Sequence, residues 1–231
     1  MKRFYQDAAA VAREKGFGVA LDGRNIRTPA KAALVVPTQS VATVIAKEWD
    51  DQGDEIDPVT MPVMKFSSTA IDLIRPNYAR VADDLAAYAQ TDLICYRAER
   101  PVDLVQLQTA SWQPLLVWCN KCHGASLRAT QGVIPIEQDE ASLSKLLAVV
   151  HSFDDFALSA LHGLTTTSGS LVIGLAVLAG HLSAVDAVGA SQVDDAYQAG
   201  KWGYDKDAAD ALLGRRREIE AAAAFYALLH E

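Results

Sequence analysis

The sequence predicts an α+β protein, with a small N-terminal α+β domain at residues 1–76 and an all-helical bundle at residues 77–231. Three observations support this fold class. Every clear strand signal precedes Pro76; after Pro76, apolar residues recur at helical spacing instead. At 231 residues, half of them hydrophobic, the chain is long enough to bury a sizeable core. Since no repeat or low-complexity linker is present, the compositional change near Pro76 is the predicted domain boundary.

The N-terminal part is predicted to mix strands with a helix. Residues 17–21 and 24–28 are extended runs that flank Asp22-Gly23, and such a pair is a strong signal for a β-hairpin. Residues 33–36 are expected to add a third strand. Thr38 is the expected cap of a helix that ends near Gly53.

A loop and a series of helices follow. Two prolines indicate an extended loop over residues 54–63, and a helix is expected from Lys65 to Ile74. Beyond Pro76, helices are predicted around residues 81–88, from Asp103, from Pro114 to Gly124, at 143–150, at 156–163, at 171–180 and at about 207–229.

The segment from Ser168 to Gly203 organises the helical part. Residues 171–180 are apolar on every side, which predicts a helix surrounded by other helices. Ser183 is expected to cap a second, continuous helix with two unlike faces. Its apolar face should dock on the buried helix, and its polar face should meet solvent or a partner. The apolar face comprises Val185, Gly189, Val193, Ala196, Tyr197 and Gly200, and the polar face comprises Ser191, Asp194, Asp195 and Gln198.

Charge and composition exclude several classes of partner. The net charge of −8 argues against binding to nucleic acid or to anionic lipid. No apolar run approaches the roughly 20 residues that cross a bilayer. An odd number of cysteines, three, does not form a disulfide framework, and the N-terminal residues do not resemble a secretory signal. We expect a cytoplasmic protein, or a processed mitochondrial matrix protein if the source is eukaryotic.

Cys119, Cys122 and His123 form the strongest catalytic or metal-binding pattern. Their C-x-x-C-H spacing could attach haem, hold zinc together with Cys95, or support redox chemistry. Haem attachment is disfavoured because no export signal is seen, and a lone C-x-x-C on a predicted helix is more typical of buried structural side chains. Nucleotide-binding and hydrolase motifs are absent. The sequence therefore favours a protein that is not an enzyme and carries no cofactor or metal, with a zinc- or redox-dependent protein as the alternative.

The order and spacing of short motifs along the chain resemble the assembly chaperones of the ATP synthase F1 α subunit. In the N-terminal part these motifs are Leu21-Asp-Gly-Arg, Arg27-Thr-Pro29, Val36-Pro-Thr38, Glu48-Trp49, Gln52, Thr60-Met-Pro62 and Thr69-Ala-x-Asp72. In the helical part they are Thr91-Asp-Leu93, Gln108, Trp112-x-Pro-Leu115, Ser168-Gly-Ser170, Asp194-Asp-Ala-Tyr-Gln198 and Lys201-Trp-Gly203.

The resemblance implies a chaperone that binds the free α subunit until the β subunit joins it, as a monomer, without catalysis or cofactor. It also implies a partner-binding site at Asp194, Asp195 and Gln198. In the family pattern L-D-E-x-Y/F-Q, Asp195 occupies the glutamate position, and whether Asp194 or Asp195 acts for that glutamate is left open. From its position after a helix, Trp202 is expected to pack in the core.

Overall fold

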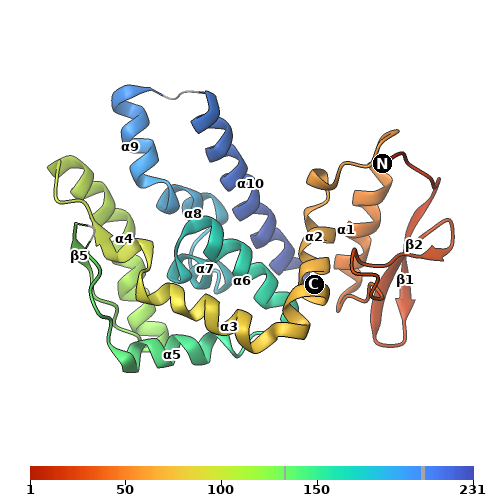
Figure 1. Ribbon diagram of the computed structural model, residues 1–231, viewed down its shortest axis with the longest axis horizontal. Helices are drawn as coiled ribbons and strands as arrows, with labels where there is room; N and C mark the ends of the chain where they lie inside the picture. Colours follow the sequence, from red (N-terminus) through yellow and green to blue (C-terminus); the bar gives the residue numbers. More distant parts are fainter. Residues whose placement is uncertain (133, 204–205) are drawn as a thin grey trace. The chain divides into compact units, whose positions relative to one another are not determined.

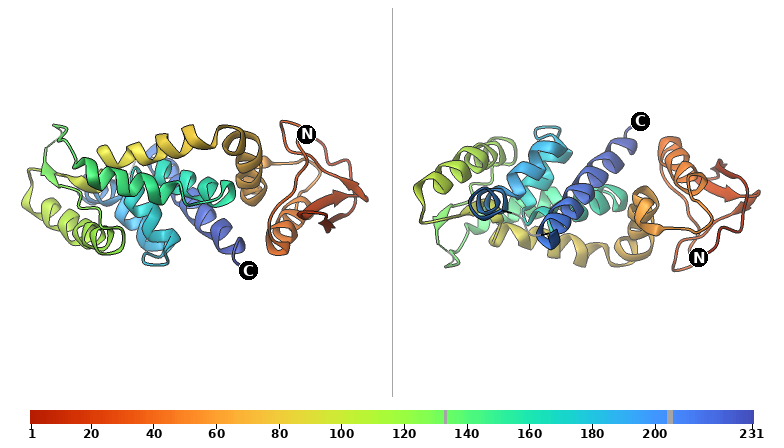
Figure 2. Two further views of the ribbon diagram at one scale, coloured as in Figure 1. Left: turned by 90° about the horizontal axis from the view of Figure 1, so that it is seen from below. Right: turned by 90° about the horizontal axis from the view of Figure 1, so that it is seen from above.

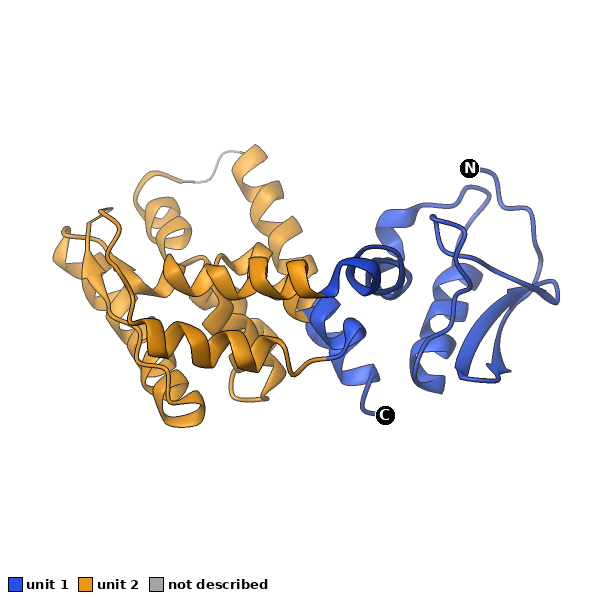
Figure 3. Ribbon diagram, turned by 60° about the horizontal axis from the view of Figure 1, so that its bottom comes forward, with its two compact units in different colours: residues 1–78, 154–160, 221–231 blue, residues 79–153, 161–220 orange. Residues whose placement is uncertain are grey.

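A computed structural model describes residues 1–132, 134–203 and 206–231. The chain divides into two compact units (Figure 3). Unit 1 comprises residues 1–78, 154–160 and 221–231, and unit 2 comprises residues 79–153 and 161–220. Each unit therefore draws on separate stretches of the chain, and the single boundary near Pro76 stays a prediction. The α+β class is confirmed: a small sheet precedes a chain that is otherwise mostly helical (Figure 1).

The sheet of unit 1 is an antiparallel meander in the order β1-β2-β3. Its strands are β1 (Ala8–Arg13), β2 (Gly16–Leu21) and β3 (Arg24–Asn25). The predicted hairpin is present, and both Asp22 (φ 46°) and Gly23 (φ 75°) have the positive φ that a tight two-residue turn requires. The third strand expected at residues 33–36 was wrong, because this segment makes only single bridges, such as Phe17 with Val36. Strand β1 was not predicted.

Helix α1 (Gln39–Asp50) packs against the hairpin (Figures 1 and 2). Thr38 caps it as expected, with its hydroxyl accepting from the Val41 N–H at 3.2 Å. Helix α2 (Pro62–Thr69) follows and continues into a π-type turn at residues 70–74. The Glu48 carboxylate fixes the start of α2, because it accepts from the Val63 N–H at 2.7 Å and the Met64 N–H at 2.8 Å.

Later residues complete the core of unit 1. Phe225 stacks on Phe66 with ring centroids 5.4 Å apart, and the Ser159 hydroxyl donates to the Phe66 carbonyl at 2.9 Å. The Thr38 hydroxyl likewise donates to the Leu228 carbonyl at 2.7 Å. These contacts explain why unit 1 includes residues far along the chain.

Helices make up nearly all of unit 2. Its helices, with α6 and α10 divided between the two units, are α3 (Tyr78–Ala87), α4 (Val102–His123), α5 (Glu140–Val150), α6 (Asp155–Ser168), α7 (Leu171–Leu178), α8 (Ala184–Ser191), α9 (Val193–Trp202) and α10 (Lys206–Leu228). Two short strands, β4 (Tyr96–Arg97) and β5 (Thr130–Gln131), pair in parallel and were not predicted. Among the described residues, no helix has the length and apolarity needed to cross a membrane.

Two predicted helix boundaries were wrong. The helices expected from Asp103 and from Pro114 are one continuous helix, α4, with Pro114 inside it. The carbonyl that this proline leaves without its helical partner belongs to Ala110, which is exposed, so water can satisfy it. Helix α6 likewise continues beyond Gly163 to Ser168.

The predicted buried helix is α7. Ser170 caps it, and the buried carboxylate of Asp92 accepts from the Val172 N–H at 3.1 Å. A side chain at Gly174 would lie 2.9 Å from the Thr165 hydroxyl, so glycine permits the close approach of α6 to α7.

The single helix expected after Ser183 was wrong. The chain forms two helices, α8 and α9, that meet at Gln192, whose φ and ψ of −119° and 20° are not helical. An apolar face drawn across both helices therefore does not exist: Ala187 and Ala190 of α8 are buried, but Val185 is 63% exposed.

Candidate partner-binding site

Helix α9 carries all three residues predicted to bind a partner. None of its residues is buried, and it packs along α4 within unit 2. Asp194 and Asp195 lie in its first turn, where the partial positive charge of the helix N-terminus stabilises carboxylates. The helix is therefore attached along one side and accessible along another.

Asp194 is held by a buried glutamine. The Gln108 side-chain amide on α4 donates to Asp194 Oδ1 at 2.6 Å, and its Oε1 accepts from the Ala98 N–H at 2.7 Å. Gln108 is only 2% exposed, so both polar atoms of its side chain need these partners. Asp194 is half-buried, and Oδ1 is the oxygen bound by Gln108.

Asp195 points to a different neighbour. Its Oδ2 forms an ion pair with the Arg215 guanidinium of α10 at 2.9 Å, and each side chain is 41% exposed. The two carboxylates are therefore not equivalent: Asp194 binds a buried neutral amide, and Asp195 binds a cation at the surface. Each has used one oxygen in these contacts, and a carboxylate can accept further hydrogen bonds from a partner.

A third contact fixes the far end of α9. The Tyr197 hydroxyl donates to both oxygens of Asp103 on α4, at 2.8 and 2.9 Å, and the Lys201 ammonium lies 3.4 Å from Asp103 Oδ2. The hydrogen bond from Tyr197, followed by weaker contributions that include Lys201, holds the pKa of Asp103 below its usual range. The pKa of Lys201 is raised, mainly by its hydrogen bond to Asp103.

Gln198 and Trp202 are the most accessible of the singled-out residues. Gln198 is exposed, so its side chain is free to contact a partner. Trp202 is 79% exposed, so the expectation that it packs in the core was wrong. It is the last residue of α9, and no element covers the indole among the described residues.

Other large apolar side chains are exposed on α4 and α10, which both contact α9. Val102 (69%) and Leu107 (51%) lie on α4, and Leu213 (43%) lies on α10. Val102 and Trp202 are the immediate sequence neighbours of Asp103 and Lys201, which pair at 3.4 Å. The surface around α9 thus combines carboxylates, an amide and exposed apolar groups, a composition typical of protein-binding surfaces.

The sequence identified α9 but not the contacts that position it. Asp103, Arg215 and Lys201 were not predicted as parts of the site, and Gln108 entered only as a motif residue. An acidic helical segment is visible in the sequence, whereas its anchors lie 20 to 94 positions away in the chain.

The alternative cysteine and histidine site is not assembled in the structure. Cys119 is buried and Cys122 is exposed, although both lie on α4 as expected. His123 packs edge-on against Trp118 at 5.1 Å. Burial raises the pKa of the Cys119 thiol to about 12, which disfavours the reactive thiolate. Within residues 1–132, 134–203 and 206–231, no group of three or more histidine, cysteine or acidic side chains could hold a metal ion.

Comparison with known proteins gives consistent likenesses. The family model described as "ATP12 chaperone protein" matches residues 2–120, just over half of the chain. The crystal structure of Atp12 from Paracoccus denitrificans has a TM-score of 0.94 and 40% identity, over 99% of this chain and 98% of that one. An aspartate-to-lysine mutant of P. denitrificans Atp12p gives the same TM-score at 39% identity, over 99% and 97% of the two chains. The mitochondrial protein atp12 of Schizosaccharomyces pombe is 23% identical over 219 residues, which are 90% of this chain and 75% of that protein.

These likenesses define the class of protein as a chaperone. The matched segment at residues 2–120 holds the sheet and most of α4, and the structural matches extend the likeness over α9. The chain belongs to the ATP12 chaperone family, which acts in ATP synthase assembly.

Proposed function

We propose that this protein binds the isolated α subunit of the ATP synthase F1 sector and prevents its aggregation until the β subunit joins it. Membership of the ATP12 family supports the role in assembly, and the motif resemblance supports the α subunit as the client. A subunit that lacks its partner exposes an apolar interface, which is a hazard for aggregation. A chaperone must cover that surface and then release it.

The observation that carries the proposal is the exposure of α9 between two anchoring helices. Contacts with Gln108, Arg215 and Asp103 fix its position without burying any of its residues. A surface that is already ordered loses less conformational entropy on binding than a mobile one. The exposed side of α9 is therefore the proposed centre of the client-binding surface.

Asp194, Asp195 and Gln198 are the proposed polar contacts to the client. Carboxylates at an interface favour a basic partner surface and mainly set association rate and orientation. Trp202 is the proposed apolar anchor, because exposed tryptophans often contribute much of the binding free energy at interfaces. Affinity is thus divided between an electrostatic part and an apolar part.

We further propose that the protein acts as a monomer, by binding alone and without a cofactor. Its proposed location is the bacterial cytoplasm, or the mitochondrial matrix for a eukaryotic source. A monomeric chaperone leaves α9 free for the client in every copy.

Light scattering of the isolated α subunit tests the proposal. The wild-type protein should suppress the increase in scattering at near-equimolar ratio. Asp194→Lys combined with Asp195→Lys should lose most of this suppression while keeping the helical circular dichroism of the wild type. The matched control is Asp83→Lys with Asp84→Lys, an adjacent exposed acidic pair on α3, which should protect the α subunit fully. Equal protection by both double variants would remove α9 from the proposed site.

A further inference from the structure

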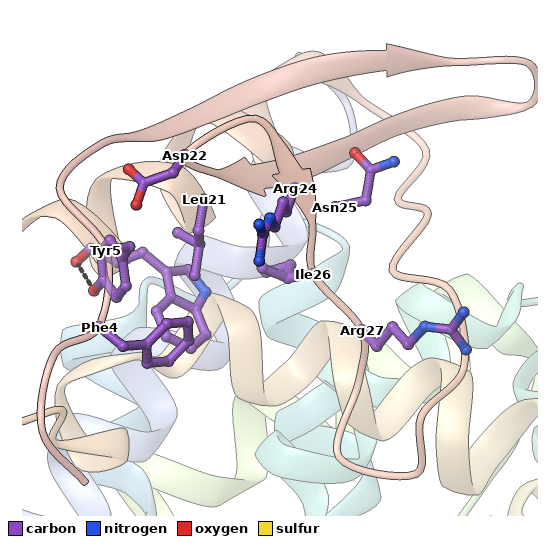
Figure 4. A pocket seen from close by; sticks show the side chains of 9 residues that line it. Phe4, Tyr5, Leu21, Asp22, Arg24, Asn25, Ile26 and Arg27 are labelled. Atoms are coloured by element: carbon purple, nitrogen blue, oxygen red, sulfur yellow. Dashed lines mark hydrogen bonds between the residues drawn. The ribbon is translucent and has the colours of Figure 1, made fainter.

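Unit 1 contains a pocket that the chaperone site does not use. Its volume is about 550 Å³, within the range of pockets that bind small ligands or a few side chains. It is lined by Phe4, Tyr5, Leu21, Asp22, Arg24, Asn25, Ile26, Arg27 and Trp49 (Figure 4). All of these residues belong to unit 1, so the pocket is complete within that unit.

One part of the pocket is aromatic. Tyr5 packs edge-on against Phe4 at 5.4 Å and against Trp49 at 5.6 Å, and the Tyr5 hydroxyl donates to the Trp49 carbonyl at 2.5 Å. Phe4 is nonetheless 66% exposed, so the cluster leaves a large aromatic surface in solvent. Such a surface stabilises a partner's apolar side chain by burial.

The other part of the pocket is basic. Figure 4 shows Phe4 and Tyr5 at one end and Arg27 at the other, with Arg24 between them. The Arg27 guanidinium donates to the neutral Lys31 carbonyl at 3.0 Å, and no acidic side chain of the described residues forms an ion pair with it. Arg24 is exposed and makes no hydrogen bond or ion pair among the described residues.

Asp22 is the acidic residue of the lining, and its carboxylate is already occupied. It accepts from the backbone N–H groups of Asp7 and Gln6, at 2.9 and 3.0 Å, and these bonds, with smaller contributions from the charges of Arg24 and Arg3, lower its pKa. Two arginines against one occupied carboxylate give the lining a net positive charge within a chain of net charge −8. A local field of opposite sign to that of the whole molecule favours anionic groups at this position.

We propose that this pocket binds a short peptide segment of a partner protein in which an acidic residue adjoins a large apolar side chain. The apolar group packs on Phe4 and Tyr5, and the carboxylate binds the Arg24 guanidinium, with Arg27 strengthening the field. Arginine suits this role because its planar group can bind both oxygens of a carboxylate. The inference uses the pocket alone and does not depend on the α subunit being the client.

The indole N–H of Trp49 provides a direct reporter. This nitrogen is buried and has no hydrogen-bond partner within residues 1–132, 134–203 and 206–231. Its NMR resonance is therefore sensitive to a ligand that repacks Tyr5 and Phe4 or supplies an acceptor. The chain has four tryptophans, and Trp49→Phe assigns the resonance by removing it.

The experiment titrates the full-length protein with three probe peptides. Acetyl-Asp-Phe-Asp-amide should shift the Trp49 indole signal and the backbone signals of Arg24 and Asn25 in a saturable way at millimolar concentration. Acetyl-Lys-Phe-Lys-amide should not, and acetyl-Asp-Ala-Asp-amide should bind more weakly, because each lacks one of the two proposed contacts.

Arg24→Glu should weaken binding of acetyl-Asp-Phe-Asp-amide roughly tenfold or more, as expected for loss of a charged hydrogen bond. The matched control is Lys15→Glu, which makes the same change of charge at an exposed position of unit 1 outside the pocket. It should leave binding unchanged. Equal binding of the lysine peptide, equal weakening by both variants, or no saturable shift would overturn the proposal.

Discussion

Gln108 on α4 and Asp194 on α9, 86 positions apart in the chain, are joined by a hydrogen bond of 2.6 Å. The amide is 2% exposed, whereas the carboxylate is half-buried at the edge of the proposed client surface. One contact thus connects the interior of unit 2 to a residue predicted to bind a partner. Asp194 therefore has a structural role as well as its proposed functional one.

Gln108→Leu should destabilise the protein by about 1–3 kcal/mol, since it leaves the Ala98 N–H and Asp194 without their partner. Urea unfolding followed by circular dichroism measures this. The control is Gln106→Leu, which changes an exposed residue of the same helix and should alter stability by no more than about 0.5 kcal/mol. Equal losses of stability in the two variants would mean that the hydrogen bonds of the buried Gln108 amide do not add to the free energy of unfolding.

Exchanging the charges of Asp195 and Arg215 separates the two roles of Asp195. The side chains of Asp195 and Arg215 are each 41% exposed, so their ion pair stabilises the fold by at most about 1 kcal/mol. Asp195→Arg alone should lose protection of the α subunit. Adding Arg215→Asp restores an ion pair but moves the carboxylate to α10, so protection should stay lost. Recovery in the double variant would show that Asp195 only positions α9.

Trp202→Ala should leave stability within about 0.5 kcal/mol of the wild type, because the side chain is 79% exposed. Affinity for the α subunit, measured by titration calorimetry, should fall tenfold or more if the indole is an anchor. Ile134→Ala, at a site 77% exposed, is the matched control and should bind normally. A tryptophan variant with wild-type affinity would exclude the anchor.

Glu48 should give unit 1 a pH-dependent stability. Burial outweighs the hydrogen bonds from Met64 and Val63 and raises its pKa from 4.5 to about 7. The folded state then binds more protons than the unfolded state, so the contribution of Glu48 to stability is greatest below pH 4.5 and decreases up to about pH 7.

Glu48→Gln removes this titration, and it also leaves one N–H at the start of α2 with a poorer acceptor. The variant should therefore be less stable than the wild type at pH 5, and the difference should shrink by pH 8. Thermal unfolding at both values measures it. A difference that grows with pH would mean that the folded-state pKa is lowered, contrary to our account.

The thiols should differ in reactivity, which also tests the zinc or redox alternative. Burial raises the pKa values of Cys95 and Cys119 to about 12, whereas Cys122 is exposed. A thiol reagent at pH 8 should modify one cysteine quickly in the native protein and all three after unfolding. Elemental analysis should find no stoichiometric zinc, and Cys119→Ser should still protect the α subunit. Bound zinc, or loss of function in that variant, would favour the alternative.

Local signals predicted much of the fold correctly. Asp22-Gly23 specifies a turn by itself, Thr38 and Ser183 cap helices within their own segments, and the apolar run of α7 marks a buried helix. Strand β1 was missed because its alanines have little strand propensity; pairing with β2 determines its structure.

The errors in the site have the same origin. The break between α8 and α9 falls at Gln192, where neither proline nor glycine marks it. Exposure of Trp202 and the anchoring of Asp194 by Gln108 depend on which helices pack together, and spacing along the chain does not contain that information. The sequence could therefore indicate the acidic helix but not what holds it.

The most direct test of the account measures the affinity of the purified protein for the isolated α subunit and for an α subunit already paired with β. We predict a saturable one-to-one complex with the isolated subunit, much weaker binding to the pair, and loss of binding in the Asp194→Lys, Asp195→Lys variant. Equal affinity for the free and paired subunit, or no complex with the free subunit, would contradict the account.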